Sequence, residues 1–155
     1  MAITTALSNA FKLELLKGNH DFDNDTFRVA LIKQSPSGTY NATTAAYTDL
    51  GSDQASGSGY TSTFDTRSSG AAAAIATGFP KVAAGTTTAI MDFDDAVFTS
   101  VTVQADGCIL YNPNADSSAD VIAVFDFGGT VSATAGDFTI QFPAPGATTS
   151  ILRLA

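Results

Sequence analysis

The chain has 155 residues, of which 45% are hydrophobic and 14% are charged, and it carries a formal net charge of −8. This length suits one compact domain, residues 1–155, that buries about 70% of its unfolded surface without disulfides. Its seven Lys and Arg argue against nucleic acid as a partner, because phosphate recognition needs clustered cations. The sequence contains no run of about 18 apolar residues, so no membrane-spanning helix is predicted. Its N-terminus also lacks a basic start followed by a long apolar run, so no signal peptide is predicted.

Residues 4–17 are predicted to form a helix that starts at a threonine at position 4 or 5 and ends at Gly18. Apolar residues recur at every fourth position on one face: Ile3, Leu7, Phe11 and Leu15. Leu13 and Leu16 widen this apolar stripe, so the helix needs a surface to cover it. Two coverings stay open, namely the protein's own sheet and a partner subunit.

The acidic loop that follows superficially matches the start of a calcium-binding loop, with acids at alternate positions: Asp21, Asp23 and Asp25. The match then fails, because Thr26 stands where the sharp turn needs glycine and Ile32 where a bidentate glutamate is needed. His20 has no second histidine or cysteine nearby. The loop is therefore interpreted as a solvated turn, and no metal is predicted.

Strands are predicted wherever apolar residues alternate between turn signals. These segments are 26–33, 86–94, 97–103, 108–112, 121–127, 138–142 and 150–155. Turns are expected at 35–38, at Asp106-Gly107, at 114–120, at Gly128-Gly129 and at 143–146. The segment 121–127 is apolar on both faces, as in a strand that is covered twice. Phe93, Val101, Leu110 and Phe125 are expected in the core.

The tract 35–88 is rich in Ser, Thr, Gly and Ala with scattered aromatics. A structureless loop of this length is unusual in a compact domain. Either the tract contains short strands, around 60–64 and 72–76, or part of it is an arm that orders against a neighbouring molecule.

Many short strands, one helix and no alternation of strands with helices predict an all-β fold. The expected architecture is an antiparallel β-sandwich or a jelly-roll-like barrel with one short N-terminal helix.

No catalytic or cofactor-binding constellation is found, so no enzyme activity and no cofactor are predicted. His20 has no context that places it near Cys108, the single cysteine, which is expected to be buried. Gly57 and Gly59 lack the third glycine and the lysine of a phosphate-binding loop. The acids that could form a carboxylate pair are interpreted as a solvated strand edge: Asp92, Asp94 and Asp95.

Eight segments spread over nearly the whole chain carry a resemblance. They are FKLELLKG (11–18), DTFRVAL (25–31), SGYT (58–61), MDFDDAVF (91–98), GCILYN (107–112), VFDFG (124–128), DFTIQFP (137–143) and ILRLA (151–155). Together they resemble a group of small structural proteins of tailed bacteriophages. The resemblance implies a virion component of the capsid decoration or cement type, which clamps neighbouring subunits on the outer capsid surface.

For such a protein the expected partner is the major capsid protein, and the expected location is the capsid surface after synthesis in the host cytoplasm. A homo-oligomer, dimer or trimer, is expected because several copies acting together gain avidity on a repeating surface. Two alternatives stay open. One is a tail, fibre or baseplate protein that binds host glycans, and the other is a cellular β-sandwich binding module.

The contacts with a partner are predicted to come from the N-terminal helix and from the tyrosines of the small-residue tract. The candidates are Ile3, Leu7, Phe11, Tyr40, Tyr47 and Tyr60. The alternative for the tyrosines is that they fill the edge of the protein's own core.

Overall fold

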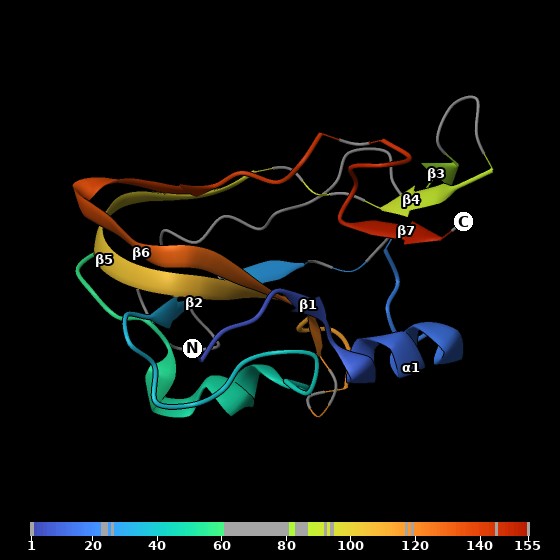
Figure 1. Cartoon of the computed structure of the whole chain (residues 1–155), viewed down its shortest axis with the longest axis horizontal. Helices are drawn as coiled ribbons and strands as arrows, with labels where there is room; N and C mark the ends of the chain where they lie inside the picture. Colours follow the sequence, from blue (N-terminus) through green and yellow to red (C-terminus); the bar gives the residue numbers. More distant parts are fainter. Residues whose placement is uncertain are drawn as a thin grey trace.

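The structure is a computed structural model that describes residues 2–22, 25, 27–60, 81–82, 87–91, 93, 95–116, 118, 120–144 and 146–154. Its elements are β1 (Ala6–Leu7), α1 (Asn9–Lys17), β2 (Arg28–Lys33), a 3-10 helix η1 (Tyr47–Asp53), β3 (Lys81–Val82), β4 (Ala89–Met91), β5 (Ala96–Tyr111), β6 (Val121–Ile140) and β7 (Leu152–Leu154). This arrangement confirms the predicted all-β class with a short N-terminal helix (Figure 1).

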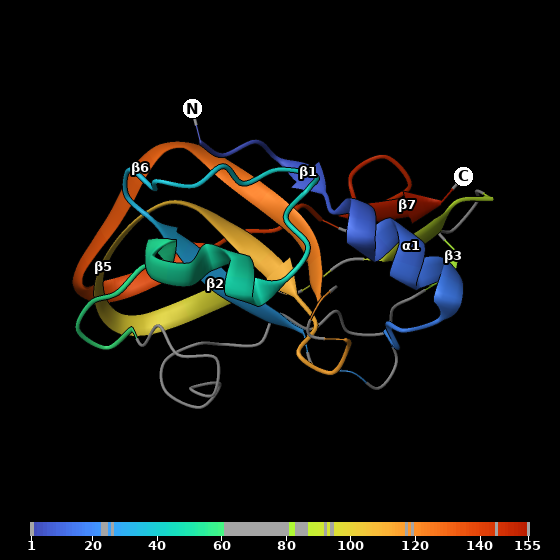
Figure 2. The same cartoon turned by 90° about the horizontal axis from the view of Figure 1, so that it is seen from below.

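The described strands form two antiparallel sheets. The larger one has the order β1-β6-β5-β2 and the smaller one the order β3-β4-β7. The smaller sheet lies beside α1 at one end of the molecule, and the bend of the β5–β6 hairpin lies at the other end (Figures 1 and 2). No helix in the described part of the chain has the length and apolar character that crossing a membrane requires.

The organising element is the β5–β6 hairpin, whose pairing runs from Tyr111 opposite Val121 to Ala96 opposite Ile140. The polar loop between these strands ends β5 just before Pro113, as the sequence predicts. The hairpin does not lie flat. It curls back over itself, so that its two halves form opposing layers (Figure 1).

The bend of this hairpin corrects two predicted turns. Asp106-Gly107 lies inside β5 and Gly128-Gly129 lies inside β6, so neither pair ends a strand. Residues 127–130 bulge opposite Asp106, because Gly107 pairs with Asp126 while Ala105 pairs with Val131. Extra residues in one strand bend the pair, and Gly128 permits this with a φ of 75°. Local sequence shows a break in the pattern, and the tertiary pairing makes it a bulge.

The larger sheet has a hydrophobic cluster on each face. Successive residues of β2 alternate between the two: Val29 and Leu31 belong to one cluster, and Ala30 and Ile32 to the other. The predicted double coverage of β6 is also confirmed, because Ile122 joins the first cluster and Val124 the second. Strict alternation therefore assigns the two faces in β2. In β6, Ile122 and Val124 lie two positions apart and still reach opposite faces, because the pairing with β5 shifts register between Leu110 and Tyr111.

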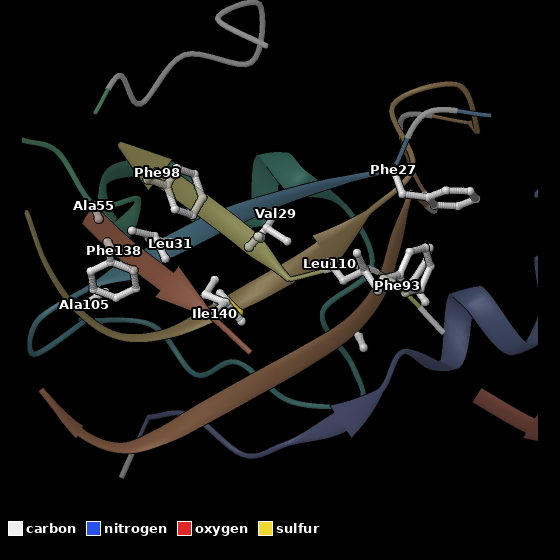
Figure 3. Packing of buried hydrophobic residues seen from close by; sticks show 14 of the residues in the cluster. Phe27, Val29, Leu31, Ala55, Phe93, Phe98, Ala105, Leu110, Phe138 and Ile140 are labelled. Carbon is white, nitrogen blue, oxygen red and sulfur yellow. The ribbon is translucent and has the colours of Figure 1, made fainter. Parts of the chain in front are cut away.

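The first cluster fills the space inside the curled hairpin. Figure 3 shows Phe98, Phe138 and Ile140 gathered around Leu31 and Val29 of β2, with Leu110 of β5 nearby. Phe93, Val101 and Leu110 are buried in this cluster, as predicted, and Phe125 packs partly buried against it.

The second cluster is covered by residues that the sequence analysis assigned to a loop or arm. Residues 36–54 run beneath the larger sheet and include η1 (Figure 1). Tyr47 and Leu50 of η1 are buried against Ile109 and Val124 of the sheet. This part of the tract is thus a third layer of the protein, and the strands predicted around 60–64 and 72–76 lie outside the described residues except for Tyr60.

The N-terminal helix is shorter than predicted. It begins after Ser8, and residues 4–7 are extended instead. The backbone N–H of Thr4 donates to the carbonyl of Tyr40 at 2.8 Å, and β1 pairs with Val124 and Ala123 of β6. A run of β-branched residues favours extended backbone, and these neighbours supply its hydrogen bonds. The predicted end at Gly18 is confirmed by its left-handed backbone, φ 75°.

The remaining strands differ from the predictions mainly in length. The segment 138–142 continues β6 to Ile140 instead of forming a strand of its own. The segments 86–94 and 150–155 contain the three-residue strands β4 and β7, which pair with each other. Asp95 is exposed, whereas Asp92 and Asp94 lie outside the described residues.

Candidate interaction surfaces

The outer face of α1 is the most exposed apolar feature among the described residues. Leu16 is 88% exposed and Leu13 is 54% exposed. They lie on the side of the helix opposite Phe11, which is fully buried and packs edge-on against His20 with ring centroids 5.0 Å apart. We call the side chains of Lys12, Leu13, Leu16 and Lys17 the α1 outer face.

The α1 outer face is also cationic. Lys12 and Lys17 against Glu14 leave the helix with a net charge of +1, in a chain whose net charge is −8. Nζ of Lys17 lies 2.8 Å from Oε1 of the buried Glu14, and Nζ of Lys12 donates to Oδ1 of Asn9 at 3.2 Å. These contacts hold the Lys17 ammonium at Glu14 and the Lys12 ammonium at the first turn of the helix. Such a face suits an apolar partner surface that is bordered by acids.

The helix is held to the body by its inner face. The backbone N–H of Ser8 donates to the carbonyl of Ile122 at 2.9 Å, and Leu15 faces an apolar groove of about 170 Å³ between α1 and the smaller sheet. The groove is lined by Leu15, Phe22, Ala89, Ile90, Met91, Leu152 and Leu154. The α1 outer face therefore sits on a firmly anchored helix.

The three predicted docking tyrosines do not lie on the surface; their side chains fill the protein's own core. Tyr40, Tyr47 and Tyr60 are all buried. This is the alternative that the sequence analysis left open. The tyrosines of this small-residue tract are buried because the segments that carry them pack directly on the larger sheet.

Tyr40 belongs to a buried polar network beneath the sheet. Its hydroxyl donates to Oδ2 of Asp53 at 2.9 Å, while Oδ1 of Asp53 lies 2.8 Å from Nζ of Lys33. Burial raises the pKa of Tyr40, and the hydrogen bond to Asp53 adds to the rise. Burial also works to raise the pKa of Asp53, but the hydrogen bonds from Lys33, Gly38, Ser37 and Tyr40 outweigh it and hold that pKa below its usual range. The network ties the third layer to β2.

Tyr47 and Tyr60 make equally specific contacts. The backbone N–H of Tyr47 donates to Oδ1 of Asp120 at 2.6 Å, and its hydroxyl donates to Oε1 of Gln54 at 2.5 Å. The hydroxyl of Tyr60 accepts a hydrogen bond from a backbone N–H of β2. Burial raises the pKa of Tyr60 to about 12, so its hydroxyl stays protonated at neutral pH.

The predicted docking residues near the N-terminus also pack into the protein's own core. Ile3 and Phe11 are buried, and Leu7 packs partly buried against the core. Only Phe11 is on α1, because Ile3 bridges to Tyr40 and Leu7 belongs to β1. The expectation that these residues share one face of a single helix is therefore wrong, since the helix starts too late to contain Ile3 and Leu7.

The other polar residues that the sequence analysis singled out are engaged in local structure. His20 lies in a loop, as predicted, but is buried, and Nδ2 of Asn112 lies 3.3 Å from its Nδ1. Burial lowers the pKa of His20. Oδ2 of Asp25 accepts from Nδ2 of Asn112 at 2.6 Å and from the backbone N–H of Asp21 at 2.9 Å. Asp23 lies outside the described residues.

Cys108 is buried, as predicted, and burial raises the pKa of its thiol. Cys108 lies inside β5 among buried apolar residues, a setting that does not favour the reactive thiolate form. In the part of the chain that the structure describes, His, Cys, Asp and Glu side chains form no group of three that could hold a metal ion.

A second apolar surface lies on β6, between its two halves. It is a pocket of about 370 Å³ lined by Phe125, Asp126, Phe127, Val131, Phe138, Thr139, Ile140, Gln141, Phe142 and Pro143. We call it the β6 pocket. The rings of Phe125 and Phe142 are 5.9 Å apart, those of Phe127 and Phe138 are 6.0 Å apart, and Val131 is 44% exposed.

Sequence reasoning missed both surfaces as sites. It noticed Leu13 and Leu16 but placed the docking face on the row that contains Phe11. The available signal was the pair of lysines beside the two leucines, since an inner helical face seldom carries such cations. The β6 pocket had no local signal, because it forms only when β6 curls and its distant ends approach.

Comparisons with protein-family models, curated proteins and solved structures found no match for this chain.

Proposed function

We propose that the protein is a capsid decoration (cement) protein of a tailed bacteriophage and that it docks on the outer shell through the α1 outer face. The observation that carries the proposal is the exposure of Leu13 and Leu16 on a helix whose opposite side is anchored by the buried Phe11. The resemblance of the chain to small virion proteins supplies the setting, and the major capsid protein is the proposed partner.

The energetics of the α1 outer face suit reversible attachment. Covering a leucine side chain contributes about 1.5–3 kcal/mol, so two leucines give one copy a modest affinity. Part of this gain is offset by the loss of free motion on binding. Strong attachment therefore requires several such contacts acting together, and a capsid presents the same binding site many times.

Charge adds specificity to this contact. The +1 helix of a −8 chain favours a partner surface that presents acids around an apolar patch. Two copies meeting face to face through α1 would bring Lys12 and Lys17 of each copy together. The α1 outer face is therefore better matched to a different protein than to itself.

The test uses point substitutions, because deletion of residues 1–17 would also remove Ile3 and Phe11 from the core. Capsids of the encoding phage that lack the protein are mixed with the purified wild type, with the double variant Leu13→Asp, Leu16→Asp and with the control Thr99→Asp. Thr99 is exposed on β5, away from α1. Binding is measured by co-sedimentation.

We expect the control to bind as the wild type does and the double variant to lose at least about tenfold in affinity. The variant replaces two leucines that the proposed contact would bury with acids, which would face the acids of the partner surface. Equal binding of all three proteins would contradict docking through α1. Imaging of intact particles with labelled protein tests the broader role: label confined to the tail tip would instead support the tail, fibre or baseplate alternative.

A further inference from the structure

His20, the one histidine of the chain, lies where α1 and the loop that follows it meet the end of β5. The residue is only 6% exposed. Its ring packs edge-on against Phe11 of α1 and stacks with Phe22 of the loop at a centroid distance of 6.4 Å. Asn112, which is fully buried and directly follows β5, contacts the same ring at Nδ1. The imidazole therefore joins the N-terminal helix to the β5–β6 hairpin.

The hydrogen bonds of Asn112 determine which nitrogen of His20 carries the proton. Oδ1 of Asn112 accepts from the backbone N–H of Asn114 at 2.9 Å, which sets the orientation of the amide. Its Nδ2 donates one hydrogen to Oδ2 of Asp25 at 2.6 Å and the other to Nδ1 of His20 at 3.3 Å. Nδ1 is then an acceptor, and the single proton of a neutral imidazole lies on Nε2.

The surroundings of the ring do not accommodate a second proton. A proton on Nδ1 would point at the N–H of Asn112, with donor against donor. Turning the amide over would bring its oxygen against the carboxylate of Asp25 and leave the N–H of Asn114 without its acceptor. Nε2 is also buried and has no hydrogen-bond partner among the described residues. A charged imidazole is therefore costly for as long as His20 stays in this place.

Two acids near the ring act in the opposite direction. Asp25 in the loop and Glu14 on α1 both favour the protonated form, but burial has the larger effect and lowers the pKa of His20. Glu14 is itself paired with Nζ of Lys17 at 2.8 Å. Asp21 is exposed, and the contact from the end of β5 is an uncharged amide. Among the described residues, the balance of these groups stabilises the neutral ring.

α1 depends on its inner face to stay folded. A helix of nine residues is marginal in water, so packing against the body supplies most of its stability. The backbone N–H of Asn9 donates to the carbonyl of Ala42 at 2.8 Å and ties down the start of the helix. Further along, the fully buried Phe11 packs against His20. Loss of the His20 contact therefore loosens α1, while the β5–β6 hairpin keeps its own core.

We propose that His20 is a pH-sensitive latch, which holds α1 against the β5–β6 hairpin while its imidazole is neutral and releases α1 when its imidazole is protonated. A proton from water binds Nδ1 and displaces the hydrogen bond from Asn112, and the charged ring leaves Phe11 for solvent. The latch is a property of this chain alone, so it does not depend on the proposed capsid role.

The direction of the pH dependence follows from the lowered pKa. In the open state His20 titrates with the usual pKa of histidine, 6.5, whereas in the closed state burial lowers that pKa. The open state therefore binds more protons at mildly acidic pH. The neutral ring stabilises the closed state fully above about pH 6.5, and this stabilisation is lost progressively as the pH falls below that value.

The test is native-state hydrogen exchange followed by NMR at pH 7.5 and pH 5.5, expressed as protection factors so that the intrinsic pH dependence of exchange is removed. We expect the protection of the α1 amides, residues 11–17, to fall about threefold or more at pH 5.5, because opening takes up a proton. At both pH values their protection should stay at least about tenfold below that of the β5 amides, residues 105–111, because α1 opens without the hairpin.

His20→Gln is the control, because glutamine keeps an acceptor for Asn112 and does not titrate. The protection of its α1 amides should be the same at both pH values. Asp120 titrates in the same range but is present in both proteins, so its effect cancels in the comparison.

The ring of His20 gives a readout that needs no variant, since the nitrogen chemical shifts of a single histidine report its tautomer and its pKa. We expect the proton on Nε2 at pH 7.5 and a pKa lower than the usual value. Four outcomes would each overturn the proposal: a neutral ring with its proton on Nδ1, wild-type α1 protection that does not change with pH, equal protection of α1 and β5, and an equally large fall in His20→Gln.

Discussion

The hydroxyl of Tyr60 accepts a hydrogen bond from the backbone N–H of Leu31 at 2.9 Å. Leu31 is in the middle of β2, at an edge of the larger sheet, and Tyr60 comes from the tract that the sequence analysis treated as a loop or arm. A buried backbone N–H needs an acceptor, and at this sheet edge the hydroxyl of Tyr60 accepts from the N–H of Leu31 in place of a carbonyl on a neighbouring strand. The tyrosine thus completes the sheet edge, in addition to filling space beside Phe98 with ring centroids 5.3 Å apart.

This contact predicts that Tyr60→Phe lowers the free energy of unfolding by about 1–3 kcal/mol, because the N–H of Leu31 loses its acceptor in a buried place. Urea unfolding followed by circular dichroism measures the change. The matched control is Thr139→Val, which removes a hydroxyl from an exposed residue of β6 and should change the free energy by less than about 0.5 kcal/mol. A Tyr60→Phe protein as stable as the wild type would show that the hydrogen bond contributes nothing.

Asp120 predicts a specific pH dependence of stability. Burial raises its pKa to about 6, although the backbone N–H of Tyr47 donates to it. A carboxyl whose pKa is higher in the folded state favours folding most below its unfolded pKa of 3.8 and loses that contribution as the pH rises through about 6. Asp120→Asn keeps an acceptor for Tyr47 and removes the titration.

We therefore expect Asp120→Asn to gain stability relative to the wild type as the pH rises from about 4 to about 7. Thermal melts across this range measure the difference. Asp116→Asn is the control, because hydrogen bonds from Ser118 lower the pKa of Asp116 and its removal should give no such gain. A difference between Asp120→Asn and the wild type that stays constant with pH would rule out the titration of Asp120 as its source.

Gly57 predicts a steric limit where the chain approaches β5. A Cβ atom at this position would meet the backbone carbonyl of Thr102, and a backbone atom cannot move aside as a flexible side chain does. Ser58 bridges to Thr102 at the same place. We expect Gly57→Ala to lower the melting temperature by several degrees, as a loss of about 1–3 kcal/mol would do.

Gly129→Ala is the matched control for this substitution, because nothing lies within 4 Å of a Cβ atom placed there. It should melt close to the wild type in differential scanning calorimetry. Equal melting temperatures for the two variants would mean that the chain around Gly57 can shift away from β5 at little cost.

The sequence by itself determined the features that depend on local periodicity and local backbone preference. Alternation in β2 assigned Val29 and Ala30 to opposite faces, and Gly18 marked the end of the helix. The all-β class, the buried Cys108 and the double coverage of β6 followed from the same rules. Each of these features needs only near neighbours along the chain, because side-chain direction is fixed within a few residues.

The tertiary structure alone decided the features that depend on which distant segment lies opposite. Gly128-Gly129 became a bulge because β6 stays paired with β5 beyond it, and residues 4–7 became extended because Tyr40 and β6 supply their hydrogen bonds. Tyr40, Tyr47 and Tyr60 became core residues because the segments that carry them pack on the sheet, whereas Leu13 and Leu16 stayed exposed because no described segment covers that side of α1. Burial is a property of pairs of segments, so the proposed working surfaces emerged only when those pairs were formed.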